Sequence, residues 1–405
     1  MKVLQINCVY NKGSTGKIMD EIHAQLSREG EQSIICYGRG PKTSDPNVYK
    51  SCSEFYAKCN NLLSRFTGLM YGGCVLSTTK LIRIIRREAP DIVHLHCING
   101  YFVNIPRLIS FLKKNGIKTV LTLHAEFMHT ANCSHAFACD KWLSGCGHCP
   151  RLKKETGSLL FDRTHTSYQN MKAAFDGFEH LTVVSVSPWL AERAARSPIL
   201  AGKDHRVVLN GLDTAIFRRV PDTKALRAEI GVGDSKMIFH ATPNFTNDPL
   251  HIKGGYYILR TAEELLARGI NAKFVIAGDH PKDLVTPDNV ILLGRVADQT
   301  RLASLYAAAD LTVIASKRET FSMVVAESLS CGTPVIGFEA GAPEQIAIPQ
   351  YSQFVEYGNT DALSKAICEA LLTPYDKETI SKTGAQKYDK AKMVRQYIEI
   401  YKERK

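Results

Sequence analysis

Short apolar segments alternate with amphipathic helical segments along this chain, and the whole pattern occurs twice. Strands that are apolar along their full length are typical of a parallel sheet covered by helices on both faces. The first half is predicted to contain strands at residues 3–8, 33–37, 91–96, 119–124, 181–186 and 206–210. The second half is predicted to contain strands at residues 237–240, 274–277, 290–293 and 311–315. We therefore expect two α/β units, each built on its own parallel sheet.

The length of the chain also favours two domains, because 405 residues exceed what one hydrophobic core usually serves. The pattern predicts an N-terminal domain at 1–210, a linker at 211–235 and a C-terminal domain at 236–375. A charged helix within 376–405 is expected to end the chain and to cross back to the first domain. Ligands of open α/β sheets bind outside the carboxyl ends of the strands, so functional residues are expected there.

Positive charge is concentrated in the first half of the chain. Residues 1–210 contain 27 Lys and Arg against 16 Asp and Glu, and the second half is balanced, so the excess of +11 belongs to the first half. Such a half is attracted to anionic lipid headgroups or to nucleic acid. The sequence contains no run of about 18 uncharged apolar residues, so no membrane span is predicted, and the N-terminus carries no secretory pattern. We expect a cytoplasmic protein.

The segment from Lys317 to Glu327 carries the most chemistry. It follows the predicted strand 311–315 and opens a helix pattern that reaches Ser330, so Glu319 is expected on the turn and Glu327 on the helix. A helix N-terminus after a strand offers free N–H groups and a positive dipole end, which suit a diphosphate. The two carboxylates can accept hydrogen bonds from the hydroxyl pairs of a sugar or a ribose. Together these features predict a sugar-nucleotide site.

The second half resembles glycosyltransferase family 4, the retaining enzymes with a GT-B fold. Glu319 and Glu327, with seven residues between them, match the two-glutamate signature of that family. The other matching segments occur in the family's order and are residues 210–213 with Phe217, residues 332–336 and residues 342–344. The resemblance implies two Rossmann-like doubly wound domains facing an interdomain cleft, with the donor held by the C-terminal domain and the acceptor by the N-terminal domain.

The resemblance also implies roles for individual residues. Glu319 would hold hydroxyls of the transferred sugar, and Glu327 would bind the ribose hydroxyls of the nucleotide. Lys253 matches the family's Lys-Gly element and would neutralise the departing diphosphate, a task that other enzymes give to a metal. The rest of the predicted donor-binding segment consists of Thr320, Phe321 and Ser322. No catalytic metal is expected.

One family feature is missing from the expected donor site. The family usually carries an arginine several residues before this lysine, whereas residues 242–247 contain none. The second cation for the diphosphate is therefore not identified by the motif. Arg295 is the candidate for a cation near the nucleotide.

In the first half, Gly16 and His124 are the predicted site residues. The segment 13–17 lacks the spacing of a phosphate-binding P-loop, but Gly16 resembles the family's glycine turn, which lets backbone approach the donor phosphate. His124 resembles the family's strand-terminal histidine, which contacts the transferred sugar. A core or capping histidine is the alternative, and it applies to His94 more than to His124.

Four cysteines lie close together in the loop 132–150. Cys133, Cys139, Cys146 and Cys149 have a spacing that allows them to hold structural zinc in a tetrahedron, with Cys146 and Cys149 separated by two residues. Bacterial family members of the colanic-acid type carry a similar loop. Disulfides or free thiols are the alternatives. Four thiolates would leave no open position for catalysis by the metal.

The predicted activity is transfer of a sugar from a nucleoside-diphosphate donor, a UDP- or GDP-sugar, to a glycan or lipid-linked acceptor in bacterial capsule or other surface polysaccharide synthesis. Peripheral contact with the inner face of the cytoplasmic membrane is expected through the basic half. Residues 80–87 and 107–114 pair apolar with basic residues, but each segment by itself is interpreted as an ordinary amphipathic helix that covers the sheet. The alternatives are a sugar-nucleotide epimerase and a basic zinc-containing nucleic-acid-binding protein. Nucleic acid has the weaker support, because no arginine-rich recognition helix is present.

Overall fold

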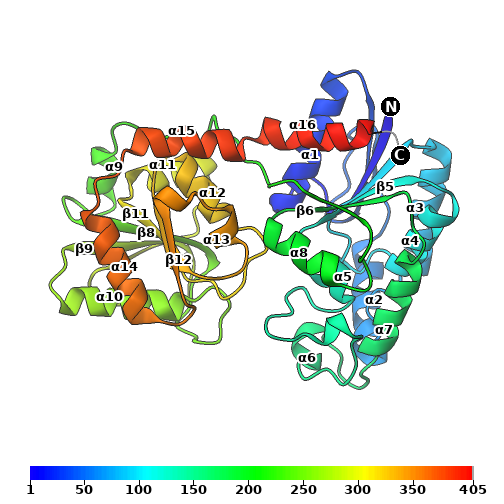
Figure 1. Ribbon diagram of the computed structural model, residues 1–405, viewed down its shortest axis with the longest axis horizontal. Coiled ribbons are helices and arrows are strands. Elements are labelled where there is room, and N and C mark those ends of the chain that lie inside the picture. Colours follow the sequence, from blue (N-terminus) through cyan, green and yellow to red (C-terminus); the bar gives the residue numbers. More distant parts are fainter. Residues whose placement is uncertain (404–405) are drawn as a thin grey trace. The chain divides into compact units, whose positions relative to one another are not determined.

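The computed structural model describes residues 1–403, which form two compact units. Unit 1 consists of Met1–Leu209 together with the chain from Met393 onward. Unit 2 consists of Asn210–Lys392. Each unit has its own sheet and its own helices, so each is described by itself (Figure 1).

Unit 1 is built on a seven-stranded parallel sheet with the order β3-β2-β1-β4-β5-β6-β7. The central strands are buried along most of their length, as in a parallel sheet covered on both faces, although polar residues such as Gln5, Asn7 and His94 lie within them. The strands are β1 (Lys2–Val9), β2 (Gln32–Arg39), β3 (Val48–Lys50), β4 (Ile92–Leu95), β5 (Lys118–Leu123), β6 (Leu181–Ser185) and β7 (Asp204–Val207).

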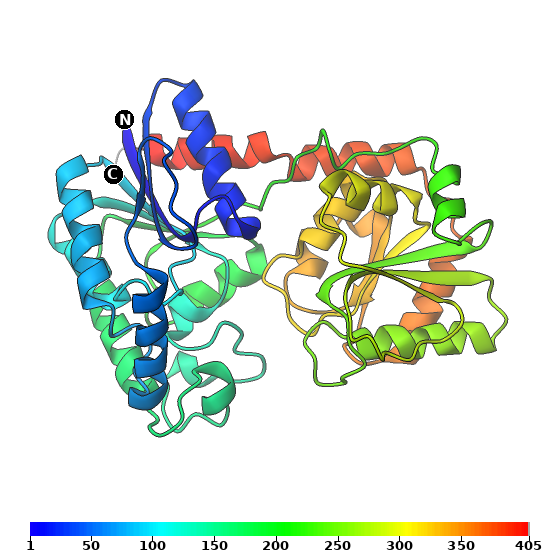
Figure 2. The ribbon, with the colours of Figure 1, turned by 180° about the vertical axis from the view of Figure 1, so that it is seen from behind.

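Helices connect the strands of unit 1 and cover its sheet (Figures 1 and 2). They are α1 (Gly13–Arg28), α2 (Glu54–Thr67), α3 (Val75–Glu88), α4 (Ile105–Lys114), α5 (Phe127–Thr130), α6 (Leu152–Glu155), α7 (Thr164–Phe175) and α8 (Pro188–Arg196), with a 3-10 turn at Lys141–Leu143. One core cluster joins α1 and the end of the chain to the sheet, and it includes Ile22, Val120 and Tyr397.

Unit 2 is built on a six-stranded parallel sheet with the order β10-β9-β8-β11-β12-β13. The strands are β8 (Lys236–Asn244), β9 (Ala272–Asp279), β10 (Val290–Gly294), β11 (Leu311–Ile314), β12 (Val335–Phe338) and β13 (Ser352–Val355). In both sheets the first strand of the unit lies in the middle, and the strand order reverses beside it. This reversal lies between β1 and β4 in unit 1 and between β8 and β11 in unit 2, where the ligands of such sheets bind.

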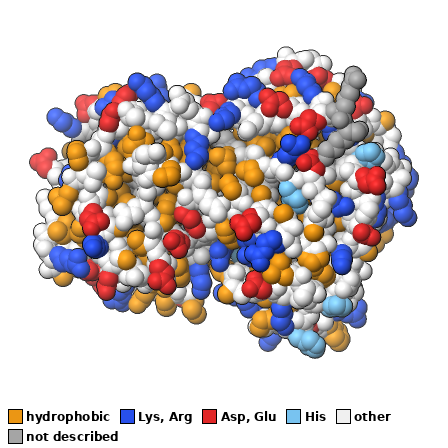
Figure 3. Space-filling view, viewed as in Figure 1, with side chains coloured by type: hydrophobic (Ala, Val, Ile, Leu, Met, Phe, Trp, Pro, Cys, Tyr) orange, Lys and Arg blue, Asp and Glu red, His pale blue; other side chains and the backbone are white. Residues whose placement is uncertain are grey.

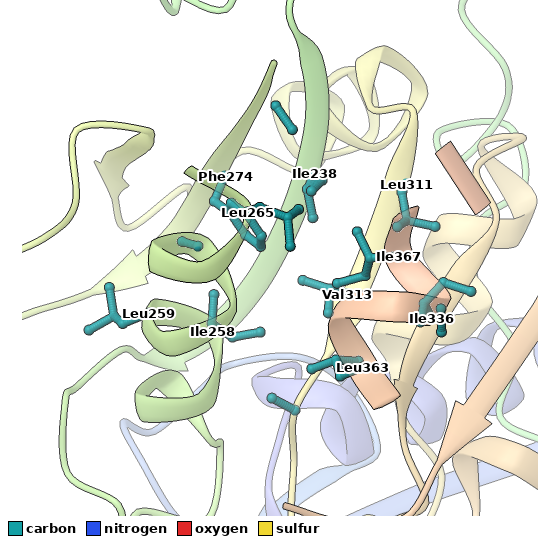
Figure 4. Packing of buried hydrophobic residues seen from close by; sticks show 14 of the residues in the cluster. Ile238, Ile258, Leu259, Leu265, Phe274, Leu311, Val313, Ile336, Leu363 and Ile367 are labelled. Atoms are coloured by element: carbon teal, nitrogen blue, oxygen red, sulfur yellow. The ribbon is translucent and has the colours of Figure 1, made fainter. Parts of the chain in front are cut away.

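The helices of unit 2 enclose its core. They are α9 (Lys224–Glu229), α10 (Gly255–Ala267), α11 (Gln299–Ala308), α12 (Met323–Ser330), α13 (Pro343–Ile346), α14 (Thr360–Leu372) and α15 (Lys377–Tyr388), with a 3-10 turn at Pro349–Tyr351. Ile258 and Leu265 of α10 and Ile367 of α14 pack against Phe274 and Val313 of the sheet (Figure 4). This packing fixes the strands whose carboxyl ends carry the predicted donor residues.

Three sequence-based boundaries need correction. Helix α1 begins at Gly13, so Gly16, which was predicted to lie in a glycine turn, is inside the first turn of the helix. The residues predicted as a linker, 211–235, belong to unit 2: within them α9 is held by Arg227, which donates to the carbonyl of Ala308 at 2.7 Å. The predicted terminal helix is two helices, α15 and α16 (Lys390–Lys402), because Asp389 has an extended backbone.

Candidate active site

Lys253 and Glu319 form the centre of the candidate site in unit 2. Lys253 lies in the loop before α10 and Glu319 in the loop after β11, and Lys253 Nζ donates to Glu319 Oε1 at 2.6 Å. Both side chains are partly exposed, at 29% for Lys253 and 18% for Glu319, so a ligand can reach the pair. The cation and the carboxylate that the sequence assigns to diphosphate and sugar are therefore in direct contact.

Backbone contacts bring the two loops together. Gly254 has a φ of 68°, and a Cβ on it would lie 2.0 Å from the carbonyl oxygen of Ala315, at the end of β11. Only glycine allows this approach, which places the Lys253 loop against the carboxyl end of the strand. The amide of Lys317 also donates to the carbonyl of Ile252 at 2.8 Å. The position of Lys253 is thus fixed by the backbone beneath it.

The loop after β12 holds the Glu319 backbone from the other side. The amide of Glu319 donates to Ala340 at 3.0 Å, and the amide of Ala342 donates back to Glu319 at 3.2 Å. This loop is itself tied by the Glu344 carboxylate, which accepts from the amides of Ala340 and Gly341. The acidic turn at 342–344 therefore supports Glu319.

The turn from Glu319 to helix α12 has an unusual backbone. Ser322 has a φ of 84°, a region that residues other than glycine rarely adopt, and this conformation costs about 1–3 kcal/mol. Phe321 is buried, which anchors the turn, and α12 begins at Met323. The free N–H groups at the start of α12 therefore follow directly after the predicted donor segment of Thr320, Phe321 and Ser322.

Glu327 lies in an open pocket of about 410 Å³ at the carboxyl ends of β8 and β9. The Tyr306 hydroxyl donates to Glu327 Oε2 at 3.0 Å. Burial and the Glu327 carboxylate raise the pKa of Tyr306 well above its usual value, so the phenol keeps the proton it donates. Arg295 lines the same pocket, 4.0 Å from Asp279.

The structure therefore divides the predicted donor residues of unit 2 between two places. Glu327 and Arg295 share the pocket, whereas Lys253 and Glu319 form the ion pair outside its lining. Tyr306 and Asp279 belong to the site, and the motifs missed them. Tyr306 was visible only as an aromatic residue in a helix pattern, and Asp279 only as a residue after a strand, so neither carried a signal of its own.

His240 is another residue that the motifs missed. It lies on β8, where its Nδ1 donates to the carbonyl of Val313 at 2.9 Å. Burial, reinforced by the positive charge of Lys253, lowers its pKa to about 4, so its imidazole is neutral at pH 7. A neutral ring adds no charge next to the Lys253–Glu319 pair.

In unit 1, Gly16 and His124 lie near the ends of strands. A Cβ on Gly16 would lie 3.3 Å from the amide nitrogen of Asn11, so the first turn of α1 packs closely on the loop after β1. His124 follows β5 directly, and burial lowers its pKa to about 4. Its ring stacks on that of His96, with centroids 5.9 Å apart.

His94 is a core residue of unit 1. Its ring nitrogens lie 2.6 Å from the hydroxyl of Tyr401 and 2.7 Å from that of Thr122. Burial lowers its pKa well below the usual value, so the ring is a neutral hydrogen-bonding group between the sheet and α16. This geometry matches the alternative stated for His94 from the sequence, a core histidine.

The predicted zinc ligands all lie in one irregular loop, and all four are free thiols. Burial raises the pKa of Cys146 to about 11 and also raises the pKa of Cys133 and Cys149, which favours thiols over thiolates. Within residues 1–403, no group of three or more His, Cys, Asp or Glu side chains converges as metal ligands. The arrangement therefore does not fit a bound metal as it stands, and zinc remains a prediction for Cys133, Cys139, Cys146 and Cys149.

The two sheets and their strand order define the chain as an α/β protein of the GT-B fold, as predicted. The structure is similar to that of sucrose-phosphate synthase from Thermosynechococcus elongatus, with a TM-score of 0.68, 16% identity and coverage of 99% of this chain and 98% of the other. It is also similar to Anabaena Alr3699/HepE, solved in complex with UDP-glucose, with a TM-score of 0.64, 17% identity and 99% coverage of both chains.

Residues 244–373 match the sequence profile of the glycosyl transferases group 1. The chain is also 25% identical over 362 residues to the putative colanic acid biosynthesis glycosyl transferase WcaC of Escherichia coli strain K12, which covers 85% of each protein. The chain is a glycosyltransferase whose residues 244–373 carry the group 1 profile. The family and the enzyme class predicted from the sequence are thus confirmed.

Within the part of the chain that the structure describes, no helix is both long enough and apolar enough to cross a bilayer.

Proposed function

We propose that this protein is a retaining glycosyltransferase that moves a sugar from a nucleoside-diphosphate donor to a hydroxyl of a lipid-linked glycan in bacterial surface polysaccharide synthesis. The observation that carries the proposal is the contact between Lys253 and Glu319, at the same carboxyl-end edge of the unit 2 sheet as the pocket that contains Glu327 and Arg295. Cations and carboxylates in this arrangement suit a ligand that has a diphosphate in its middle and hydroxyl groups at both ends.

The expected roles follow from the chemistry of the side chains. Glu327 accepts hydrogen bonds from the ribose hydroxyls, with Tyr306 holding its second oxygen. Arg295 lies in the same pocket and supplies the cation that the missing family arginine would provide. Glu319 accepts from hydroxyls of the transferred sugar, and Lys253 is placed beside it for the diphosphate.

Charge on the leaving diphosphate grows as the bond to the sugar breaks. An ammonium group held in place stabilises that charge without reorganisation, which makes it more effective than the same charge in water. The N–H groups at the start of α12 add a fixed partial positive charge. Unit 2 can thus stabilise the leaving group with its own residues.

A UDP-sugar is the first donor to test, because HepE was solved with UDP-glucose. The polysaccharide acceptor is supported by the name of the colanic acid relative. Retention of the anomeric configuration follows from the predicted membership of glycosyltransferase family 4. The proposed position at the inner face of the membrane is supported by the basic charge of residues 1–210.

Donor-dependent thermal stabilisation tests the proposal. UDP-, GDP- and ADP-sugars are added separately, and one of them should raise the melting temperature, because a ligand at 100 times its Kd adds about 2.7 kcal/mol. Glu327→Gln should reduce this shift. No stabilisation by any sugar nucleotide, together with salt-dependent binding of DNA or RNA, would favour the nucleic-acid alternative. Conversion of the donor to its epimer without an acceptor would favour the epimerase.

A further inference from the structure

Helix α2 of unit 1 places its large apolar side chains in solvent. Its buried residues are small or polar, namely Ala57, Asn60 and Ser64. Its exposed large apolar residues are Phe55, Leu62, Leu63 and Phe66, with exposed fractions of 78%, 54%, 54% and 48%. An amphipathic helix of a globular protein normally has the opposite arrangement. The exposed side of α2 is therefore not explained by the packing of unit 1.

The exposed residues of α2 form a single face. At 100° per residue, Phe55, Cys59, Leu62, Leu63 and Phe66 fall within an arc of about 100°. This face points away from the buried stripe of Ala57, Asn60 and Ser64. In Figure 2, α2 lies in front of the other helices of unit 1 and is not covered by them. The apolar face is thus turned outward.

Two neighbouring segments extend this face. Leu159, Leu160 and Phe161 are 45%, 65% and 53% exposed, and the amide of Leu159 donates to the carbonyl of Arg65 at 2.8 Å, at the end of α2. Leu76, at the start of α3, is 71% exposed, and its amide donates to the hydroxyl of Tyr56 at 3.1 Å. Val75 beside it is 52% exposed. The α2 patch consists of Phe55, Leu62, Leu63, Phe66, Val75, Leu76, Leu159, Leu160 and Phe161.

Basic side chains border the α2 patch. Arg107 donates to the carbonyl of Val75 at 3.2 Å, and the Arg163 guanidinium lies 5.8 Å from the ring centroid of Phe161. The exposed basic residues of the patch segments and their border are Lys58, Arg65, Arg107, Lys153, Lys154 and Arg163.

The acidic residues of the same segments already have partners. Glu54 pairs with Arg39 and Glu155 with Arg151, while Asp162 accepts from the amides of Cys149 and Thr164. The border of the patch therefore has a net positive charge.

The other basic helices of unit 1 have no comparable apolar face. In α3, Leu81, Ile82, Ile84 and Ile85 are buried, and in α4, Leu108, Ile109 and Leu112 are buried. Lys and Arg side chains gather at the edge of unit 1 where α3 lies, at the right of Figure 3. The segments 80–87 and 107–114 are thus ordinary amphipathic helices whose apolar sides face the core.

We propose that the α2 patch docks unit 1 onto an anionic lipid surface. Apolar side chains surrounded by lysine and arginine suit the boundary between acyl chains and acidic headgroups, where each basic residue is attracted to the surface charge. A second copy of this chain fits less well, because a symmetric dimer through the patch would bring the basic borders together. The inference rests on the membrane contact in the proposed function and gives that contact a location.

Sedimentation with vesicles tests this location. Wild-type protein should pellet with phosphatidylcholine vesicles that contain about 30% phosphatidylglycerol, an anionic lipid used here as the probe. It should bind phosphatidylcholine alone much more weakly, and added salt should weaken binding to the anionic vesicles. The double variant Leu62→Glu, Phe66→Glu, called the α2 variant, should bind at least about tenfold more weakly, because two apolar anchors are lost and two negative charges are added.

Matched controls separate docking from general effects of added charge. Leu372→Glu and Val285→Glu also add a carboxylate at an exposed apolar residue, at 86% and 84% exposure, but in unit 2. Both should bind vesicles as wild type does, and all variants should melt close to the wild-type temperature. Equal binding by wild type and the α2 variant would overturn the proposal. A second result would also overturn it: wild type does not bind vesicles, and light scattering shows a wild-type dimer that becomes a monomer in the α2 variant.

Donor binding distinguishes this inference from the proposed transfer reaction. The α2 variant should keep the full donor-dependent shift of the melting temperature, because the patch lies in unit 1 and the donor residues lie in unit 2. A protein that docks on vesicles but is stabilised by no sugar nucleotide would refute the transferase proposal and leave the docking surface intact.

Discussion

Replacing Lys253 by methionine should abolish most transfer while leaving the fold almost unchanged. The Lys253–Glu319 pair is partly exposed, and such pairs contribute about 0.2–1 kcal/mol to stability, which corresponds to a few degrees in melting temperature at most. Removing a preorganised group that faces developing charge costs about 10²–10³-fold in kcat, or about 2.7–4 kcal/mol. The loss of activity should therefore greatly exceed the loss of stability.

A double-mutant cycle determines which role the pair has. Lys253→Met, Glu319→Gln and the double variant are compared in an assay of donor consumption and in thermal unfolding. If the pair only held two loops together, the double variant would recover activity relative to Lys253→Met, because no unpaired carboxylate would remain. Donor binding by both residues predicts that the double variant is at least as impaired as either single variant.

Lys365→Met serves as the matched control for the loss of a lysine in unit 2. Its side chain is 77% exposed, and its nearest carboxylate, on Glu369, is 3.9 Å away. This variant should retain wild-type turnover. Near-wild-type kcat/KM in Lys253→Met, measured against this control, would refute the assignment of Lys253 to the diphosphate.

Three further outcomes are expected. Gly254→Ala should destabilise unit 2 by about 2–5 kcal/mol in urea unfolding, since strain at positive φ adds to a clash with Ala315, whereas Gly269→Ala, with a similar φ and nothing within 4 Å, should cost only about 1–2 kcal/mol. The pKa of His240 is about 4 in the folded state and 6.5 in the unfolded state, so the unfolded state binds more protons between these values. The free energy of unfolding should therefore fall as the pH is lowered below 6.5, by about 2 kcal/mol at pH 5. Denaturant titrations at pH 5 and above pH 6.5 should show that His240→Asn loses this part of the pH dependence. If zinc binds the cysteine loop, elemental analysis should find about one zinc per chain, and Cys149→Ser or a chelator should lower the melting temperature while Cys368→Ser does not; metal-free protein with unchanged melting would contradict the zinc prediction.

The fold was predictable because its signal is repeated along the chain. Largely apolar runs such as 119–123 and 311–314 are typical of strands buried on both faces of a sheet, and the helices between them favour parallel pairing. Boundaries were less predictable. Nothing in the charge pattern of the terminal segment indicates that Asp389 interrupts the helix, because its extended backbone depends on contacts such as that of Lys390 with the carbonyl of Leu212.

The α2 patch shows a different limit of sequence patterns. The spacing of Phe55, Leu62 and Phe66 predicts an amphipathic helix, but spacing cannot say whether the apolar side is covered. That depends on which neighbours the chain supplies, and here the sheet side of α2 is filled by Ala57, Asn60 and Ser64. Residues 80–87 and 107–114 combine apolar and basic residues, and the structure confirms the preferred interpretation of each as an ordinary amphipathic helix, because it buries most of their apolar residues.

The sequence predicted which residues belong to the candidate site, but it did not predict which of their side chains contact one another. Lys253 and Glu319 are 66 positions apart, and nothing in either motif indicates that their side chains meet. They meet because β11 lies beside β8 although β9 and β10 come between them in the sequence, so the loops that follow these two strands leave the sheet next to each other. Tyr306 reaches Glu327 in the same way, from the helix that precedes β11. Strand order, rather than motif spacing, therefore determines which predicted residues act together, and a chain with the same motifs on another strand order would not form this site.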